Sequence, residues 1–393
     1  MNVLFYQHQY PAFGGIETVT TLLARQFVKD GHRVKIVSFR HRDGTGLLEQ
    51  LPDGATWQEL PEERFDSAAN MTALSAIFND FVPDVVIFQD SYTNIHTLLF
   101  EVIAGYRARH KVKVFAVEHN EPLGTWRLRK ADRNLWTVFC RFVKICIWPY
   151  YKRRRLKIEA GRRVEIAKFV DAYVVLADAY AKTVRELVGP VLAGRVLVIP
   201  NPAASVSAKA KGEKENVVLF VGNLSVTKGV DRMLKAWRSI ERLVPGWRFR
   251  IVGDGDMRTR LELLSLGLYH VDFLGAQAEP SNYYKTASIF LSASDYEGWP
   301  MTLCEAMSHG CVPVAFDSFG ALREIVENGR SGLIVSAFNI RAFSNALRKL
   351  MIDQSMLKQM SGAAVSGMAS FGAQLVAQRW YELFSCSKVR AAR

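Results

Sequence analysis

The sequence predicts an α/β protein built from two doubly wound domains that face each other across a cleft. Short runs of β-branched and aromatic residues alternate with longer stretches whose apolar residues recur at helical spacing. This alternation is typical of a parallel sheet covered by helices. The pattern stops and then restarts after Asn216. The length agrees with two domains, because 393 residues exceed the roughly 150 of an ordinary domain.

Five candidate strands lie in the first half of the chain. Each is a short run of mostly apolar, often β-branched residues, which is typical of a strand buried in a parallel sheet. We expect them at residues 2–6, 33–38, 84–89, 112–117 and 171–176. Between the first two, Glu17–Asp30 keeps its apolar residues about 3.6 positions apart, which predicts a helix packed on the sheet.

The second half repeats this design after a linker. Residues 200–215 contain prolines, small residues and alternating charges without an apolar face, as linkers do. The predicted Rossmann-like domains are therefore residues 1–199 and 216–370, and residues 371–393 are expected to form a C-terminal helix that returns to the N-terminal domain. The second strand series is expected at residues 217–221, 248–252, 270–274, 288–292, 312–316 and 332–335.

The composition is that of a soluble globular protein. Hydrophobic residues make up 49% and charged residues 23% of the chain, which excludes wholesale disorder and a polytopic membrane protein. The five cysteines lack the spacing of a zinc site or a disulfide framework, so we expect reduced thiols. No signal peptide is recognisable, and the most apolar window, residues 137–151, is shorter than the ~20 residues of a membrane-spanning helix. We therefore expect a cytoplasmic protein.

Positive charge is concentrated in one segment. The chain has 51 Lys and Arg against 38 Asp and Glu, a net charge of +13, which predicts an anionic partner. Residues 126–168 hold fourteen of the basic and only three of the acidic residues, a net +11, interleaved with aromatic residues. This pattern favours a surface-lying membrane anchor. Two alternatives stay open: a nucleic-acid-binding surface, which no motif accompanies, and a solvated helical face over an aromatic core. The densest basic run is Lys152, Arg153, Arg154 and Arg155.

The stretch SDYEGWPMTLCEA, residues 294–306, carries the most information about function. A strand ends before it, and Pro300 suits the first turn of a helix that begins near Met301. The amide groups of Met301, Thr302 and Leu303 would then be free donors, which bind a phosphate well at a helix start.

Two glutamates flank this predicted anion site. Glu297 precedes the helix start, and Glu305 lies about one turn into the helix. Carboxylates accept hydrogen bonds from sugar hydroxyls, so the arrangement suits a nucleotide-sugar with its ribose, diphosphate and sugar. A bare pair of glutamates at this spacing would mean little, but its place after a strand and beside a Gly-Trp-Pro turn favours the binding site.

Two glycine-bearing turns predict further contacts to a ligand. In GNLSVTKG, residues 222–229, Lys228 stands just before a predicted helix, where its charge would neutralise a diphosphate. A lysine at such a turn is also commonly just solvated. In FGGIE, residues 13–17, Gly14 and Gly15 allow close backbone approach, although a turn without a ligand would look the same. No G-x-G-x-x-G follows a strand, which disfavours ordinary dinucleotide binding.

Together these segments resemble the retaining glycosyltransferases of the GT-B fold, specifically glycosyltransferase family 4 (group 1). The matching pieces span almost the whole chain, and the two glutamates separated by seven residues are the most specific of them. The pieces are FGGIE (13–17), VEHN (117–120), IPNP (199–202), VGNLSVTKG (221–229), VGDG (252–255) and EGWPMTLCE (297–305).

The resemblance implies a role for each candidate residue. Glu305 would bind the nucleotide ribose and Glu297 the hydroxyls of the donor sugar, while His119 would lie over that sugar near its anomeric carbon. His119 and Glu297 therefore form the expected catalytic set. The expected donor-binding set, including the groups around the diphosphate, is Gly14, Gly15, Asn223, Lys228, Met301, Thr302, Leu303 and Glu305.

Two features depart from this simple assignment. The family usually has Arg where this chain has Asn223, so half of an expected Arg/Lys clamp on the diphosphate is missing, and donor affinity is the property that this departure affects. Asp254 and Asp256 follow an apolar strand, as paired carboxylates do in metal-dependent GT-A glycosyltransferases. A strand–helix turn rich in Gly and Asp is the alternative, and it fits the second strand series better.

The resemblance implies a hexosyltransferase. Because the predicted anion sites are built from Lys228 and helix starts, we expect that it needs no metal or other cofactor. Its expected partners are a nucleotide-sugar, with UDP as the family-based nucleotide, a lipid-linked or glycan acceptor in cell-surface polysaccharide or glycolipid synthesis, and the anionic cytoplasmic face of the membrane, but not nucleic acid. Retention is thought to proceed on one face of the sugar, with the protein supplying electrostatic stabilisation and positioning. A sugar-nucleotide epimerase on the same fold, or a non-catalytic protein that binds nucleic acid or anionic lipid, are the alternatives.

Overall fold

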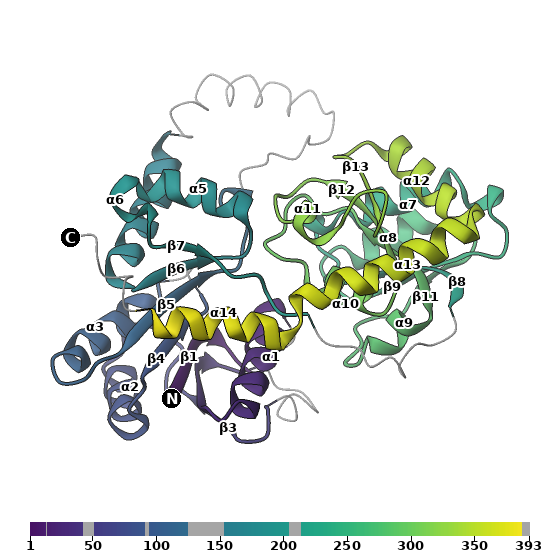
Figure 1. Ribbon diagram of the computed structural model, residues 1–393. Coiled ribbons are helices and arrows are strands. Elements are labelled where there is room, and N and C mark those ends of the chain that lie inside the picture. Colours follow the sequence, from purple (N-terminus) through teal and green to yellow (C-terminus); the bar gives the residue numbers. More distant parts are fainter. Residues whose placement is uncertain (13, 42–50, 91–93, 125–152, 204–213, 387–393) are drawn as a thin grey trace. The chain divides into compact units, whose positions relative to one another are not determined.

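The computed structural model describes residues 1–12, 14–41, 51–90, 94–124, 153–203 and 214–386 (Figure 1). The chain divides into two compact units. Unit 1 comprises Met1–Pro200 and Val376–Arg393, and unit 2 comprises Asn201–Leu375. Each unit contains one parallel β-sheet with helices packed on it.

Unit 1 has a seven-stranded sheet in the order β3-β2-β1-β4-β5-β6-β7, with every pair parallel. Its strands β4 and β6 are buried at every position, as expected of strands covered on both faces. The strands are β1 (Asn2–Gln9), β2 (Arg33–Arg40), β3 (Ala55–Glu59), β4 (Val85–Phe88), β5 (Lys113–Glu118), β6 (Ala172–Val175) and β7 (Val196–Val198).

Helices connect these strands, as the crossovers of a parallel sheet require. They are α1 (Gly15–Lys29), α2 (Ala68–Phe81), α3 (His96–Arg107), α5 (Asp178–Val188) and α6 (Pro190–Ala193), together with a helix over residues 153–169.

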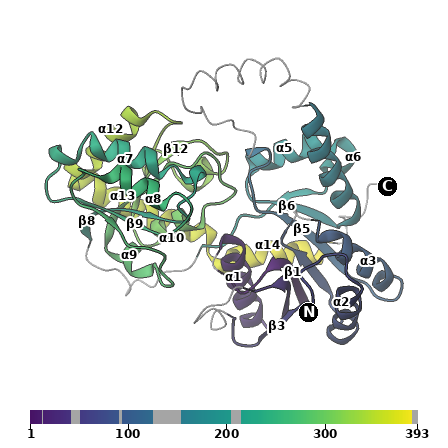
Figure 2. The same cartoon turned by 180° about the vertical axis from the view of Figure 1, so that it is seen from behind.

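The C-terminal helix α14 (Ala373–Ser385) packs on unit 1 from Val376 onward (Figures 1 and 2). Its Phe384 ring stacks on Phe115 of β5 at 5.7 Å and meets Phe27 of α1 edge-on at 5.8 Å. Two parallel α/β units and this returning helix confirm the predicted fold class.

Unit 2 has a six-stranded parallel sheet in the order β10-β9-β8-β11-β12-β13. The core on this sheet includes Trp237, Phe249, Leu291, Val314 and Phe343. The strands are β8 (Glu215–Val221), β9 (Arg248–Val252), β10 (Val271–Phe273), β11 (Ala287–Ser292), β12 (Val312–Asp317) and β13 (Leu333–Ser336). The helices are α7 (Val230–Arg238), α8 (Arg258–Ser265), α9 (Ser281–Thr286), α10 (Met301–Ser308), α11 (Leu322–Ile325), α12 (Ile340–Ile352) and α13 (Gln354–Met368).

Both sheets reverse their strand order at one place. In unit 1 the chain adds strands outward from β1 and then from β4, and in unit 2 from β8 and then from β11. The loops that leave the carboxyl ends of two such strands turn away from each other, which is where α/β sheets bind ligands. Each unit therefore has one topologically favoured binding place.

The part of the chain that the structure describes contains no helix with the length and apolar character needed to span a membrane. The apolar window at residues 137–151 lies outside the described residues, as does most of the predicted linker.

Candidate functional site

Two loops meet at the strand reversal of unit 2. One follows β8 and ends at Gly229, and the other spans residues 293–300 after β11. The amide of Asp295 donates to the carbonyl of Thr227 at 2.8 Å. Arg232, in the first turn of α7, forms an ion pair with Asp295 at 2.6 Å and donates to the carbonyl of Ala293 at 2.8 Å. These bonds hold the two loops in a fixed relation to each other.

Gly229 makes this close approach possible. Its φ is 69°, in the left-handed region that glycine adopts at little cost. A Cβ at this position would lie only 2.2 Å from the carbonyl oxygen of Ala293. Any larger residue would push the loop after β11 away from the loop after β8.

The structure brings Lys228 and Glu297 together. Lys228 Nζ lies 2.6 Å from Glu297 Oε1, and Ser294 Oγ donates to the same oxygen at 2.7 Å. The lysine side chain is 29% exposed and the glutamate 14%, so the pair is partly shielded from water. The two residues that the sequence assigned to the diphosphate and the donor sugar are therefore each other's partners in this structure.

Helix α10 begins at Met301, as predicted, and Pro300 is its N-cap rather than its first residue. The Pro300 carbonyl accepts from the amide of Leu303 at 3.1 Å. The expectation of three free amides is wrong for Leu303, because the first turn tightens into an i to i+3 bond and engages that donor. Met301 and Thr302 keep their place at the helix start. The preceding turn is fixed by Trp299, whose buried ring meets Phe371 edge-on at 5.1 Å.

Glu305 is held by a tyrosine that the sequence did not reveal. Tyr284 of α9 is 1% exposed, and its hydroxyl donates to Glu305 Oε2 at 2.9 Å. Burial raises the pKa of Glu305, and the Tyr284 hydrogen bond acts in the opposite direction. The ring of His309 stacks on Tyr284 at 5.7 Å. A buried tyrosine commonly finds a partner for its hydroxyl, but nothing in the sequence indicates which one.

Asn223, in the place where the resemblance leads us to expect Arg, is exposed. Its side chain packs against the next glycine turn, since a Cβ on Gly255 would lie 2.4 Å from Asn223 Oδ1. Asn223 therefore contacts the turn after β9 and brings no positive charge to the site.

The Asp254 and Asp256 pair lies in that turn. Asp254 Oδ1 accepts from the amide of Gly255 at 2.8 Å, and its Oδ2 pairs with Arg258 at 3.1 Å. Arg258 also pairs with Glu262 at 2.9 Å. Asp254 thus holds the turn after β9 and pairs with the first residue of α8, in agreement with the turn interpretation. Within the described ranges, no group of three or more metal-ligating side chains occurs.

In unit 1, Gly14 and Gly15 lie at the start of α1. Gly14 is the N-cap, and a Cβ there would lie 2.2 Å from Glu17 Oε2. The Glu17 carboxylate therefore folds back over the helix start, and burial raises its pKa. The backbone amide of Glu17 itself hydrogen-bonds this carboxyl group, which acts against the effect of burial on its pKa. Residue 13 of the same motif lies outside the described residues.

His119 follows β5 in unit 1. Its Nε2 lies 2.6 Å from Gln89 Oε1 at the end of β4. Burial lowers the pKa of His119 to about 3, so the imidazole is neutral at physiological pH. It can accept or donate a hydrogen bond but does not supply a positive charge.

The residue before His119 anchors the strand end. Glu118 and Arg163 are each 1% exposed and form a bidentate ion pair, with Arg163 Nε 3.0 Å from Glu118 Oε2. Tyr173 of β6 donates to the same oxygen at 2.8 Å. Arg163 also pairs with Glu159 at 2.8 Å. Part of the basic segment therefore builds the core of unit 1 rather than a surface.

The remainder of that segment is only partly described. Arg153, Arg154 and Arg155 open the helix over residues 153–169 and are exposed. Lys152 and residues 126–151 lie outside the described residues.

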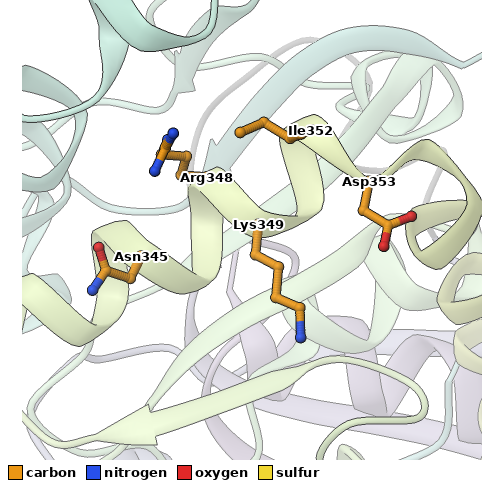
Figure 3. Close-up of a pocket in the computed structure, with 5 residues that line it drawn as sticks. All are labelled: Asn345, Arg348, Lys349, Ile352 and Asp353. Carbon is orange, nitrogen blue, oxygen red and sulfur yellow. The ribbon is translucent and has the colours of Figure 1, made fainter.

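A shallow surface depression lies on α12 in unit 2 (Figure 3). It shares no residue with the loops described above. Its lining consists of Asn345, Arg348, Lys349, Ile352 and Asp353.

Comparison with known proteins gives two family matches. The model described as Glycosyltransferase Family 4 matches residues 13–204. The model described as Glycosyl transferases group 1 matches residues 204–366. Together the two matches cover all but the two ends of the chain.

Relatives with curated names are similar over parts of the chain. An exopolysaccharide phosphotransferase of Streptomyces coelicolor is 30% identical over 223 residues, which are 56% of this chain and 24% of that protein. An amylovoran biosynthesis glycosyltransferase of Erwinia amylovora is 30% identical over 44% of this chain and 49% of its own length. An α-1,4-N-acetyl-D-galactosaminyltransferase of Campylobacter jejuni, named for a PP-undecaprenol glycan, is 27% identical over 49% of this chain and 55% of its own. The chain thus spans between about a quarter and about half of these relatives.

Solved structures share the fold over almost the whole chain. The Staphylococcus aureus protein TarM, in complex with fondaparinux, α-GlcNAc-glycerol and UDP, superposes with a TM-score of 0.75 at 12% identity, covering 98% of this chain and 100% of that chain. The Anabaena protein HepE, in complex with UDP and glucose, gives a TM-score of 0.74 at 19% identity, with the same coverage.

Proposed function

The chain belongs to the group 1 glycosyltransferases of the GT-B fold, and on that premise we propose that it transfers a sugar from a UDP-sugar to a lipid-linked glycan with retention of configuration. Its donor site is the carboxyl edge of the unit 2 sheet between β8 and β11. The observation that carries the proposal is the convergence there of Lys228, Glu297 and the start of α10, with Glu305 one turn further along that helix.

The chemistry of these groups matches the parts of a nucleotide-sugar. Lys228 and the amides of Met301 and Thr302 are suited to the diphosphate, because a helix start and an ammonium group both favour negative charge. Glu305, held by Tyr284, is suited to the two adjacent hydroxyls of a ribose, and Glu297 to the hydroxyls of the sugar. Asn223 adds no charge, so Lys228 is the main ionic contact of this site.

Names of similar proteins support the finer choices. UDP is present in the complexes of TarM and HepE, and the Campylobacter relative is named for a glycan on diphospho-undecaprenol. On this basis we propose a UDP-sugar as the donor and a lipid-linked glycan as the acceptor of this protein.

The residues present suit stabilisation of a leaving diphosphate rather than covalent catalysis. Lys228 and the α10 amides would balance the negative charge that develops on the leaving group. We assign the neutral His119 to a sugar hydroxyl, and we expect the departing phosphate to take the proton of the acceptor. No metal is required in this scheme, because the positive charge comes from the lysine and the helix start.

A lipid-linked acceptor requires that the protein bind at a membrane surface. Arg153, Arg154 and Arg155 form an exposed basic start to the helix over residues 153–169. We propose that they and Lys152 hold unit 1 on an anionic bilayer, as basic clusters do.

The test is a transfer assay with the full chain and labelled UDP-, GDP- and dTDP-sugars, with an undecaprenyl diphosphate-linked glycan as acceptor. We expect hydrolysis or transfer from a UDP-sugar, an α-linked product from an α-linked donor, and full activity in a strong chelator. Inversion would refute retention, and loss in chelator restored by Mg²⁺ or Mn²⁺ would place a metal in the mechanism. Absence of both turnover and binding with every donor would refute the function.

A further inference from the structure

A chain of hydrogen bonds in unit 1 ends on His119. Gln7 Nε2 lies 2.7 Å from the carbonyl oxygen of Gln9, and Thr20 Oγ1 lies 2.6 Å from Gln7 Oε1. Gln89 Nε2 lies 3.3 Å from Thr20 Oγ1, and His119 Nε2 lies 2.6 Å from Gln89 Oε1. The side chains of Gln7, Thr20 and Gln89 are almost fully buried. The chain connects β1, α1, β4 and the end of β5, the elements around the strand reversal of this unit.

The backbone carbonyl at one end fixes the direction of every bond. A carbonyl oxygen only accepts, so the amide nitrogen of Gln7 must face Gln9 and its Oε1 must face Thr20. Gln7 Oε1 also only accepts, so the Thr20 hydroxyl donates its one proton to Gln7. Thr20 Oγ1 must then accept from the Gln89 amide. Gln89 therefore presents its Oε1 to His119, and His119 Nε2 must carry a proton. The opposite orientation would place the Gln7 oxygen 2.7 Å from the Gln9 oxygen, a contact between two acceptors.

We propose that Gln89 is a positioning residue that fixes His119 with its proton on Nε2 and presents Nδ1 as a hydrogen-bond acceptor for a sugar hydroxyl. The inference rests on the proposed function, since it gives His119 a defined partner group in that reaction. A neutral imidazole with this tautomer accepts from a hydroxyl at Nδ1, and it neither donates there nor attracts a phosphate by charge. His119 thus selects a hydroxyl-bearing substrate.

The ionisable groups near His119 do not determine its tautomer, which is set by the chain of hydrogen bonds through Gln89. Glu118 points to the opposite face of β5, where it is paired with Arg163. Asp90 follows Gln89. Burial first, and then the charge of Asp90, raises the pKa of Glu17 of α1, whereas the lowered pKa of His119 is due to burial. Among the described side chains, only Gln89 hydrogen-bonds the imidazole of His119. Burial lowers the pKa of His119 to about 3, in keeping with a neutral ring whose partner is uncharged.

The direct test is the tautomer itself. The full chain is labelled with ¹⁵N-histidine, and the His119 ring signals are assigned among the eight histidines by their loss in His119→Gln. We expect a protonated Nε2 and an unprotonated Nδ1 at neutral pH. A proton on Nδ1 alone, or on both nitrogens, would overturn the proposal.

A second test changes the partner without changing its size. In Gln89→Glu a carboxylate replaces the amide oxygen and favours the imidazolium form, so the pKa of His119 should rise. Protonation of Nδ1 then removes the acceptor, and kcat/KM should fall by about tenfold for each pH unit below the raised pKa. The wild type should show no such ionisation down to about pH 5.

Gln58→Glu, an exposed change on β3, is the matched control and should keep the wild-type pH profile. An unchanged profile in folded Gln89→Glu would overturn the positioning role. If that variant does not fold, the ¹⁵N spectrum of the wild-type protein still tests the predicted tautomer of His119. The predicted tautomer without any transferase activity would refute the proposed function and the assignment of Nδ1 to a sugar hydroxyl, but it would leave the positioning of His119 by Gln89 standing.

Discussion

Lys228 Nζ and Glu297 Oε1 lie 2.6 Å apart at the carboxyl edge of the unit 2 sheet. Each of these residues was assigned a different part of the substrate, yet in this structure they neutralise each other. A diphosphate that approaches Lys228 must compete with this carboxylate for the lysine or share the lysine with it. The pair therefore links donor binding to the position of Glu297.

This pairing predicts non-additive effects on UDP binding. Lys228→Gln should weaken binding by about tenfold, because a charge-assisted hydrogen bond contributes about 1.5–3 kcal/mol. Glu297→Gln should leave binding unchanged or tighten it, because the lysine is released. Calorimetry on the two single variants and the double variant checks this. If the double variant binds much more weakly than Lys228→Gln alone, the pair does not compete with UDP.

Removing the Tyr284 hydroxyl should weaken nucleotide binding through Glu305. Tyr284→Phe keeps the buried ring but deletes the donor to Glu305 Oε2, and loss of one such bond costs about 1.5–3 kcal/mol when the acceptor is charged. We expect the Kd for UDP to rise by about tenfold, with little change in kcat at saturating donor. Tyr381→Phe, which removes a hydroxyl bonded to Asp30 in unit 1, is the control. Equal effects of the two changes would contradict a role for Tyr284 in the site.

Breaking the buried Glu118–Arg163 pair should destabilise unit 1. Arg163→Met leaves the Glu118 carboxylate buried and without its main partner, which costs about 3–5 kcal/mol. Urea unfolding should show this loss, and the double change with Glu118→Gln should recover part of it. Arg162→Met, on the same helix but more exposed, should cost under about 1 kcal/mol. If Arg163→Met lowered the free energy of unfolding as little as Arg162→Met does, the Glu118–Arg163 pair would not hold the strand end.

The basic start of the helix over residues 153–169 predicts salt-sensitive binding to anionic vesicles. Each engaged Lys or Arg contributes about 1 kcal/mol near an anionic leaflet. Replacing Lys152, Arg153, Arg154 and Arg155 with Ser should sharply reduce co-sedimentation. The matched control removes four charges from unit 2, at Arg341, Arg348, Lys349 and Lys358. Equal binding to neutral vesicles, or tighter binding to single-stranded nucleic acid at the same salt, would exclude the membrane role.

The sequence predicted the buried strands well because their composition is nearly uniform. Runs such as Val85–Phe88 are apolar at every position, which is the pattern of a strand covered on both faces. The edge strand Ala55–Glu59 was missed, because ATWQE alternates and carries few large apolar residues. The three-residue strand Val196–Val198 was too short to recognise.

The relative positions of the site residues were predictable from the local pattern where those residues share one motif. Glu297, Met301, Thr302 and Glu305 are close in sequence, so a strand end and a helix start place them together. The bonds of Tyr284 to Glu305 and of Gln89 to His119 join residues 21 and 30 positions apart. Such bonds depend on the packing of separate elements, which no local pattern encodes.

The central claim is that the edge between β8 and β11 binds a nucleotide-sugar with divided roles for its two glutamates. The most direct measurement compares the calorimetric Kd for UDP and the turnover of the intact donor in Glu305→Ala and Glu297→Ala. We predict that Glu305→Ala weakens UDP binding by about 1.5–3 kcal/mol for each hydrogen bond lost, whichever sugar is attached. Glu297→Ala should leave UDP binding nearly unchanged and lower turnover. Equal losses of UDP affinity in the two variants would contradict the account.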